Sequence, residues 1–265
     1  MIGRDCIVLG GKGFVGSAIV RQARERGYSV RVVGREDYDQ WVGSACDLLI
    51  NANGNSKKFL GRENPALEFD LSVRSVLKSM CDFKVGLYVY LSTMDVYPDV
   101  SDPALNHEDV AIDSTRQSPY GFHKYLSEQI VRRYAGRWLI FRMAGSVGPG
   151  LWKNSIFDLL NGQPLRVHPD SEYQYLHTDD LARAILAVAE TGATQQVFNI
   201  AGRGLISLRQ VARMIPQCRL DAAWETLPRE RYEMNVEKLG RLCPLPRTED
   251  ALTAFLKAAS AGHRP

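Results

Sequence analysis

The chain has 265 residues, of which 45% are hydrophobic and 24% are charged, proportions that fit a globular protein and exclude a disordered or collagen-like chain. Its 33 basic and 30 acidic side chains leave a formal net charge of +3, which argues against binding nucleic acid by bulk charge. No apolar run approaches the roughly 18 residues that span a bilayer. We therefore expect one large α/β domain, with or without a small appendage, and neither a nucleic-acid nor a membrane partner.

The N-terminus and the cysteines both favour a cytoplasmic protein. Residues 1–5 have no signal-peptide pattern and lead directly into a strand-like segment. The cysteines are odd in number and form no C-x-x-C pair, so they predict reduced thiols rather than disulfide bonds or a zinc site. His177 precedes two aspartates without a third ligand at suitable spacing, and we expect no metal. The cysteines are Cys6, Cys46, Cys81, Cys218 and Cys243.

Apolar runs and helical patterns alternate along the first 144 residues. Short apolar runs that are typical of buried parallel strands lie at residues 6–9, 30–33, 47–52, 86–92 and 138–143. Helices are predicted over residues 14–26, 66–81 and 118–134, the last with Ser118 as N-cap and Pro119 at its first position. This alternation is the signature of a doubly wound parallel sheet.

Beyond residue 144 glycines and prolines cluster and the alternation loosens. A helix is predicted over residues 179–190, a strand over 197–200, and short helices over 207–215 and 249–259. We expect residues 1–144 to form a nucleotide-binding core whose sheet later segments complete. Residues 145–265 are expected to form mainly a small substrate-binding region over the end of that sheet.

A glycine-rich loop follows the first predicted strand. Gly10, Gly13 and Gly16 have the G-x-x-G-x-x-G spacing that a tight strand-to-helix turn, close approach of a pyrophosphate and close helix packing each require. The helix that follows offers free N–H groups and the positive end of its dipole to phosphates. The loop predicts a Rossmann-type fold and a bound NAD or NADP. The expected contacts in this loop are Gly10, Lys12, Gly13, Phe14, Val15 and Gly16.

The end of the second predicted strand favours NADP. An acid there would bond the adenosine ribose of NAD, but the chain has Gly34 followed by Arg35. A guanidinium suits a 2′-phosphate by charge and by its fork of donors, and Lys12 can add to that charge. NAD remains the alternative if Arg35 stacks on adenine or faces solvent. Asp47, next to the third predicted strand, is a candidate adenine contact with either cofactor.

Tyr120 and Lys124 lie one helical turn apart on one helix face. A nearby ammonium favours tyrosinate and lowers the phenol pKa, so this tyrosine can exchange a proton near neutral pH. The lysine can also hold the nicotinamide ribose. Ser92 and Thr93 end the fourth predicted strand, at the edge of the sheet where ligands bind. A hydroxyl there can bond the substrate oxygen that Tyr120 protonates.

Together these motifs resemble the extended short-chain dehydrogenase/reductase family of nucleotide-sugar epimerases, dehydratases and reductases. The resemblance extends from Gly10 to about Leu256 and includes Ser92–Tyr97, Tyr120-x-x-x-Lys124 and His177–Ala182. It implies a catalytic triad in which Tyr120 is the acid/base, Thr93 polarises the substrate oxygen, and Lys124 tunes Tyr120 and binds the ribose. It also implies a homodimer through a four-helix bundle that includes the Tyr120 helix.

The residues after Thr93 separate the family's reactions. Dehydratases of this family resemble Thr-Asp-Glu here, whereas this chain has Met94 and Asp95, and methionine cannot donate a proton. Dehydration is therefore disfavoured. Asp95 occupies a place that faces the substrate in relatives, where it would act as acid/base or hydroxyl anchor. The alternative is that Asp95 caps a helix or turn.

The second half departs from the family pattern. Gly145 stands where 4-epimerases usually have asparagine, and Tyr173 stands where an arginine often contacts the diphosphate. Other side chains could hold the substrate instead. His177 reads as a structural histidine before a helix capped by Asp179 or Asp180, and His123 as a residue outside the reaction. The candidate substrate contacts are Thr93, Met94, Asp95, Trp152, Lys153, Arg166 and Arg231.

These observations favour an NAD(P)-dependent reductase of a keto-sugar nucleotide, in which hydride reaches the carbonyl carbon and Tyr120 protonates the oxygen. One alternative is a nucleotide-sugar epimerase with tightly bound NAD(P). Another is a reductase of a non-sugar carbonyl, which the missing arginine at Tyr173 would suit. A non-catalytic NADP sensor is disfavoured because the Tyr120–Lys124 pair is intact.

Overall fold

A computed structural model describes residues 3–216 and 218–260. Its centre is a six-stranded parallel sheet of order β2-β1-β3-β4-β5-β9. This arrangement confirms the Rossmann-type doubly wound sheet. The strands are β1 (Asp5–Leu9), β2 (Ser29–Val33), β3 (Ala45–Asn51), β4 (Lys84–Thr93), β5 (Trp138–Met143) and β9 (Gln196–Ile200).

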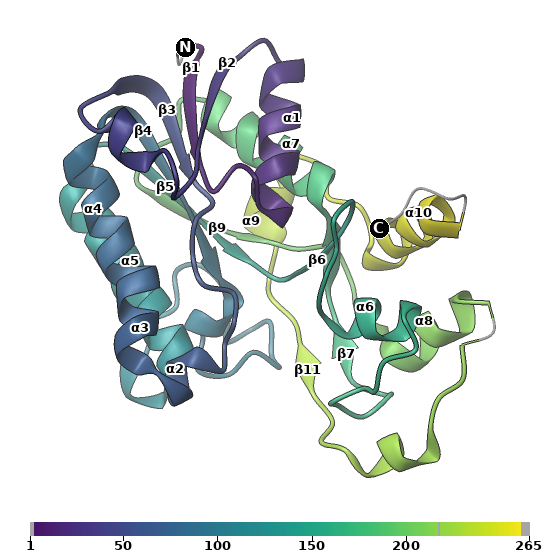
Figure 1. The fold of residues 1–265 in the computed structure, drawn as a ribbon. Coiled ribbons are helices and arrows are strands. Elements are labelled where there is room, and N and C mark those ends of the chain that lie inside the picture. Colours follow the sequence, from purple (N-terminus) through teal and green to yellow (C-terminus); the bar gives the residue numbers. More distant parts are fainter. Residues whose placement is uncertain (1–2, 217, 261–265) are drawn as a thin grey trace.

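Helices cover both faces of this sheet (Figure 1). One face packs against α1 (Phe14–Glu25) and α7 (Thr178–Glu190), and the other against α4 (Ser75–Asp82) and α5 (Pro119–Tyr134). Side chains alternate between the two faces, so Leu48 and Ile50 join the α1/α7 cluster while Leu49 joins the other. The strand runs read as almost continuously apolar because both faces are buried.

The helix predicted over residues 66–81 is a longer helical run whose middle turn is π-helical rather than α-helical. It comprises α3 (Pro65–Phe69), the π-helical η2 (Asp70–Arg74) and α4. Glu68 in this run is buried and bonds to Ser72 and to His123 of α5. The polar residue His123 therefore has a structural partner inside the helix layer, as its position off the Tyr120 face suggests.

The N-caps differ in one place from the prediction. The Ser118 hydroxyl accepts from the Gly121 N–H at 3.1 Å, with Pro119 at the first position of α5, as predicted. The cap of α7 is instead His177, whose Nδ1 accepts from the Asp179 N–H at 3.2 Å. Asp179 does not cap because its carboxylate is paired with Arg21, across on α1.

A small lobe lies beside the sheet, with its own apolar cluster that includes Val147, Ile156, Leu208 and Leu252 (Figure 1). Its strands are β6 (Gly145–Val147), β7 (Glu172–Tyr173), β8 (Tyr175–His177), β10 (Ile206–Ser207) and β11 (Arg231–Tyr232). Its helices are α6 (Ser155–Leu160), α8 (Leu208–Met214), η5 (Ala222–Thr226) and α10 (Thr248–Ser260). The second half of the chain thus supplies this lobe as well as α7 and β9 of the central layer.

Short helical turns complete the chain. They are η1 (Tyr38–Trp41), α2 (Leu60–Glu63), η3 (Met94–Val96), η4 (Ser114–Arg116) and α9 (Glu237–Gly240). Among the described residues, none of the helices has the length and apolarity needed to cross a membrane.

Candidate active site

The glycine loop forms a turn into which larger residues would not fit. Gly10 has φ +73°, and a Cβ there would lie 3.0 Å from backbone atoms of Ala52 and Asn53. A Cβ at Gly16 would collide with the Gly10 carbonyl. Helix α1 starts at Phe14, and no side chain caps its N-terminus. The loop therefore presents a backbone cradle and a free helix N-terminus, which fit a pyrophosphate.

Four residues of this loop, Gly13 to Gly16, line a cavity of about 430 Å³. Its wall continues along the segment after β3 to the ends of β4 and β5, and then to the small lobe at Leu151–Asn154. The cavity thus joins the glycine loop to the predicted catalytic residues Thr93, Tyr120 and Lys124. This placement at the carboxyl edge of a parallel sheet is where ligands of such sheets bind.

The end of β2 presents one free guanidinium. Arg35 is exposed, and its side chain has no hydrogen bond or ion pair within the described chain. Lys12 is instead paired with Glu36, so its charge is already compensated. The Glu36 carboxylate lies directly over Gly34, where a Cβ would come within 2.5 Å of Oε2. Residue 34 has no side chain, but the Glu36 carboxylate occupies the place where an acid at residue 34 would lie. The sequence alone did not indicate this role for Glu36.

Asp47 does not lie near this nucleotide end, which corrects the predicted adenine contact. It lies early in β3, and its Oδ2 accepts from the Asp5 N–H at 3.0 Å, at the start of β1. The glycine loop follows the other end of β1, beside Asn51. A parallel strand rises about 3.3 Å per residue, so Asp47 lies more than three residues below the ligand edge.

Tyr120 and Lys124 are both buried where α5 passes the end of β4. The Tyr120 hydroxyl donates to the Asn55 carbonyl at 3.2 Å, and the Lys124 ammonium donates to the Leu91 carbonyl at 3.1 Å. The Lys124 ammonium also lies 4.5 Å from the centre of the Tyr90 ring. Both predicted catalytic groups are therefore held by backbone carbonyls of the strand and loop beside them.

The electrostatics of this pair differ from the prediction. Burial raises the pKa of Tyr120 well above its ordinary value, and the Asp95 carboxylate adds to the rise. The expected lowering of this pKa by Lys124 is not found, because the ammonium points to Leu91 and the phenol is fully desolvated. Burial also lowers the pKa of Lys124 to about 8. In this state Tyr120 keeps its proton at neutral pH.

Thr93, Asp95 and Lys58 form a chain of polar contacts beside Tyr120. The Thr93 hydroxyl donates to Asp95 Oδ2 at 2.7 Å, and the Lys58 ammonium donates to Asp95 Oδ1 at 2.7 Å. The turn η3 is capped by Thr93, which accepts from the Asp95 N–H at 3.3 Å, and not by the Asp95 carboxylate. The carboxylate is therefore available for contacts within the site.

The neighbours of Thr93 direct their side chains into the protein interior, although Ser92 still forms part of the cavity wall. Ser92 is buried and donates to Glu128 at 2.6 Å, on the opposite face of β4. Met94, a predicted substrate contact, is 4% exposed and packs with Val96 and Tyr97. Met94 lines neither this cavity nor a second one of about 600 Å³, which shares Lys58 and Tyr120 with the first and is also lined by Asp95 and Tyr232. The prediction for Met94 is thus wrong, because the turn at η3 rotates its side chain into the core.

Two of the four predicted contacts from the second half reach the cavity. Trp152 and Lys153 line it, with the Lys153 ammonium 5.0 Å from the Trp152 ring centre and bonded to the Ser56 carbonyl. Burial and the neighbouring Lys58 and Lys57 ammonium groups lower the pKa of Lys153 to about 8. Through Lys153, the small lobe therefore contacts the segment that follows β3.

Arg166 and Arg231 line neither cavity, contrary to prediction. Arg166 is exposed on the small lobe. Arg231 donates to the Ser101 carbonyl and pairs with Glu172 at 3.2 Å and Glu233 at 2.6 Å. Side chains alternate along a strand, so the two residues of β11 point in opposite directions. The next residue, Tyr232, lines the second cavity, and Arg231 does not.

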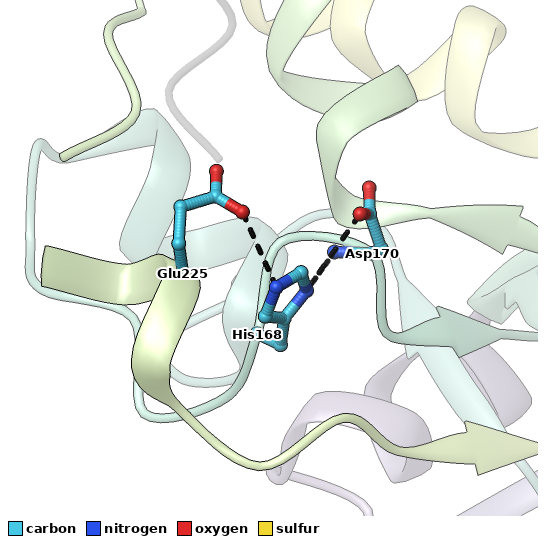
Figure 2. A group of neighbouring side chains, drawn as sticks. All are labelled: His168, Asp170 and Glu225. Atoms are coloured by element: carbon cyan, nitrogen blue, oxygen red, sulfur yellow. Dashed lines mark hydrogen bonds and ion pairs between the residues drawn. The ribbon is translucent and has the colours of Figure 1, made fainter. Parts of the chain in front are cut away.

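One group of residues has the composition of a metal site. His168, Asp170 and Glu225 lie together in the small lobe (Figure 2), and His168 Nε2 is 3.2 Å from Glu225 Oε2. The Arg209 guanidinium donates to the Asp170 carboxylate at 2.6 Å and to the Glu225 carboxylate at 2.8 Å. The backbone N–H of Asp170 donates to His168 Nδ1 at 2.9 Å. The cluster is therefore a charge-compensated network that ties α8 to η5, and its ligand atoms are engaged by protein groups.

Three residues beside the predicted catalytic groups were missed in the sequence. Asn55 and Lys58 follow β3, and Tyr232 lies in β11, with its ring centre 5.3 Å from the Lys58 ammonium. A usable signal existed for the first two, because the loop after each parallel strand opens at the ligand edge. Tyr232 is brought in by pairing of β11 with β7, which no local pattern indicates.

Comparison with known proteins identifies the family of the chain. The model of the NAD dependent epimerase/dehydratase family matches residues 6–201. The dTDP-4-dehydro-6-deoxy-D-allose reductase of Streptomyces bikiniensis is 23% identical over 263 residues, covering 80% of each chain.

Solved structures share the fold across nearly the whole chain. A UDP-galactose 4-epimerase is 22% identical with a TM-score of 0.78, covering 97% of this chain and 99% of that one. RMD from Pseudomonas aeruginosa, solved with NADPH, is 18% identical with a TM-score of 0.74, covering 96% and 98%. The family match confirms the resemblance read from the motifs. The chain belongs to the NAD dependent epimerase/dehydratase family and is an NAD(P)-dependent enzyme of the oxidoreductase and epimerase type.

Proposed function

We propose that this enzyme reduces the carbonyl of a 4-keto sugar nucleotide. The observation that carries the proposal is the placement of the buried Tyr120 in the cavity that also contains the glycine loop, Thr93 and Lys124, where burial raises the pKa of the phenol. A tyrosine that holds its proton suits the donor role in reduction. The reductase name of the Streptomyces relatives supports the same direction of reaction.

The residues of this chain divide the work of that reaction. A bound reduced nicotinamide would supply hydride to the carbonyl carbon, and the Tyr120 hydroxyl gives its proton to the oxygen, so that an alcohol forms. The Lys124 ammonium offsets the charge of the tyrosinate that remains. Thr93 bonds the substrate oxygen once its hydroxyl turns from Asp95. Burial of these groups strengthens each contact because little water competes.

We propose NADPH as the cofactor. The exposed and unpaired guanidinium of Arg35 supports it, since this group can bond a 2′-phosphate through two donors. Glu36, paired with Lys12, is the feature that would favour NADH instead, by accepting from a ribose hydroxyl. The choice therefore depends on whether Arg35 or Glu36 meets the ribose.

The first test follows the absorbance of reduced nicotinamide with dTDP-4-keto-6-deoxyglucose, comparing NADPH with NADH and the wild type with Tyr120→Phe and Arg35→Ala. We expect oxidation with NADPH, a loss of about 10³-fold or more in Tyr120→Phe, and a lower NADPH-to-NADH preference in Arg35→Ala. Cofactor binding without net oxidation, together with conversion of one sugar epimer into another, would replace reduction by epimerisation. Oxidation only with carbonyls that carry no nucleotide would replace the substrate class.

We also propose a cytoplasmic homodimer. Phe122 on α5, the helix expected at the interface, and Leu67 and Phe69 on the neighbouring α3 are 36–43% exposed. Exposed aromatic and aliphatic groups on neighbouring helices favour burial against a second copy. The five cysteines are all unpaired, which fits a reducing compartment. Light scattering of the purified protein would give twice the mass of one chain if the proposal holds.

A further inference from the structure

The Lys58–Asp95 ion pair stands between two hollows of the molecule. Lys58 and Tyr120 line both the cavity of about 430 Å³ described above and a second one of about 600 Å³. Asp95 and Tyr232 line the second cavity. A ligand whose reacting carbon is at Tyr120 and whose ring extends into the second cavity would therefore contact this pair.

The pair has unused bonding capacity directed at such a ligand. Of the three donors of the Lys58 ammonium, one bonds to Asp95, and the described chain has no other acceptor for this group. The Asp95 carboxylate bonds to Thr93 and Lys58 and can accept further hydrogens. Asp95 is 12% exposed, whereas Lys58 is 56% exposed, so the carboxylate is fixed and the ammonium is within reach of a ligand.

The position of the Lys58–Asp95 pair relative to the reacting carbonyl determines which group of the substrate the pair can bind. The Asp95 Oδ2 lies 2.7 Å from the Thr93 hydroxyl, which meets the reacting oxygen in the proposed reaction. A group bound by Asp95 and Lys58 is therefore next to that oxygen. A hydroxyl on the adjacent carbon fits both partners, since it donates to a carboxylate and accepts from an ammonium. The Tyr232 ring, 5.3 Å from the Lys58 ammonium, limits the position of that ammonium and offers an apolar face to the sugar ring.

We propose that Lys58 and Asp95 bind the hydroxyl on the carbon next to the substrate carbonyl, and that Lys58, held by Tyr232, makes the enzyme specific for a hydroxylated sugar ring. This inference rests on the proposed function, because it takes the reacting carbon to be C4 and the neighbouring hydroxyl to be that at C3. It gives the enzyme a means to reject carbonyl compounds that lack the hydroxyl. Partial desolvation of the ammonium would lower the pKa of Lys58, but the Asp95 carboxylate outweighs this effect and raises the pKa, so the ammonium stays charged.

The test measures dissociation constants by calorimetry, which needs no turnover. The probes are dTDP-glucose, whose C4 hydroxyl stands for the product alcohol, and its 3-deoxy analogue. We expect the wild type to bind the analogue about 10- to 100-fold more weakly, the range for a hydrogen bond to a charged group. Lys58→Met should weaken binding of dTDP-glucose by a similar factor and leave the analogue unchanged. Lys58→Arg should retain part of the discrimination.

Lys57→Met is the matched control, because Lys57 is an exposed neighbouring lysine that lines neither cavity. It should bind both probes as the wild type does. Equal affinity of the wild type for the two probes, failure to bind either, or an equal loss on both in Lys58→Met would overturn the inference. Discrimination that depends on Lys58, in an enzyme that oxidises no NADPH with keto sugars, would uphold the hydroxyl contact while refuting the proposed reduction.

Discussion

The sheet core and the small lobe hold their charges in opposite ways. In the core, Arg142 and Glu128 are 1% and 0% exposed, and the guanidinium bonds both carboxylate oxygens at 3.1 and 2.8 Å. In the lobe, Arg209 bonds Asp170 and Glu225 at similar distances, but these side chains are 29–44% exposed. Water screens the lobe network and cannot reach the core pair.

The contrast explains where chemistry is located in this protein. The two predicted catalytic groups with altered acidity, Tyr120 and Lys124, lie where regular elements exclude water. Basic residues of the lobe, such as Arg209 and Arg231, are neutralised by nearby carboxylates at the surface. A positive charge in the lobe sequence is therefore weak evidence for an anion site, whereas a titratable group at the sheet edge is strong evidence for catalysis.

The largest test of this contrast is Lys124→Met. We expect a fall in kcat of about 10²- to 10⁴-fold, the range for loss of proton-transfer catalysis. In the wild type the pKa of Lys124 is lowered to about 8, so activity should fall as the pH rises through 8 and the ammonium is lost. Activity that stays constant from pH 7 to 9.5 would show that the charge of Lys124 has no part in the reaction.

The same lysine predicts a pH dependence of stability. The unfolded lysine keeps its proton up to its ordinary pKa of 10.5, so the unfolded state binds more protons than the folded state between pH 8 and 10.5. The free energy of unfolding therefore rises with pH across that window, and burial of the ammonium costs stability below it. Lys124→Met should be more stable than the wild type at pH 7, with a difference that shrinks by pH 9.5. Urea unfolding at both pH values, with Lys57→Met as the exposed control, measures this.

A second test compares the buried and the exposed networks directly. Glu128→Gln leaves the Arg142 guanidinium buried without its counter-charge, and we expect a loss of about 3–5 kcal/mol in the free energy of unfolding. Arg209→Gln removes a partner from a network that water screens, and the loss in the free energy of unfolding should be several-fold smaller. Chemical denaturation of both variants in the same buffer gives the comparison. Similar losses in the two variants would mean that burial does not separate the regions.

The motifs predicted the core, and they selected candidate catalytic residues that the fold brings to one cavity, because each motif depends on short-range patterns. The spacing of Tyr120 and Lys124 fixes them on one face of α5, and the apolar runs locate every strand of the central sheet. Asp47 was misplaced because it lies at the start of the third strand, whereas ligands of a parallel sheet bind at the ends of its strands. Arg231 was misread because the pairing of β11 with β7, a contact between distant segments, decides which side chain faces the cavity.

The smallest expected effect is a difference in KM between variants of two cationic residues of the small lobe, Lys153 and Arg231. Lys153 lines the cavity and has no carboxylate partner within the described chain, whereas Arg231 is engaged by Glu172 and Glu233. Lys153→Met should raise the KM for the sugar nucleotide about 10-fold, the loss of one hydrogen bond to a charged group. Arg231→Gln should change KM by less than about 3-fold, because the Arg231 guanidinium is already paired with surface carboxylates. Steady-state kinetics of both variants at two salt concentrations would decide the matter. A larger KM effect at Arg231 would mean that its ion pairs open when substrate binds, and that the lobe uses its surface charges after all.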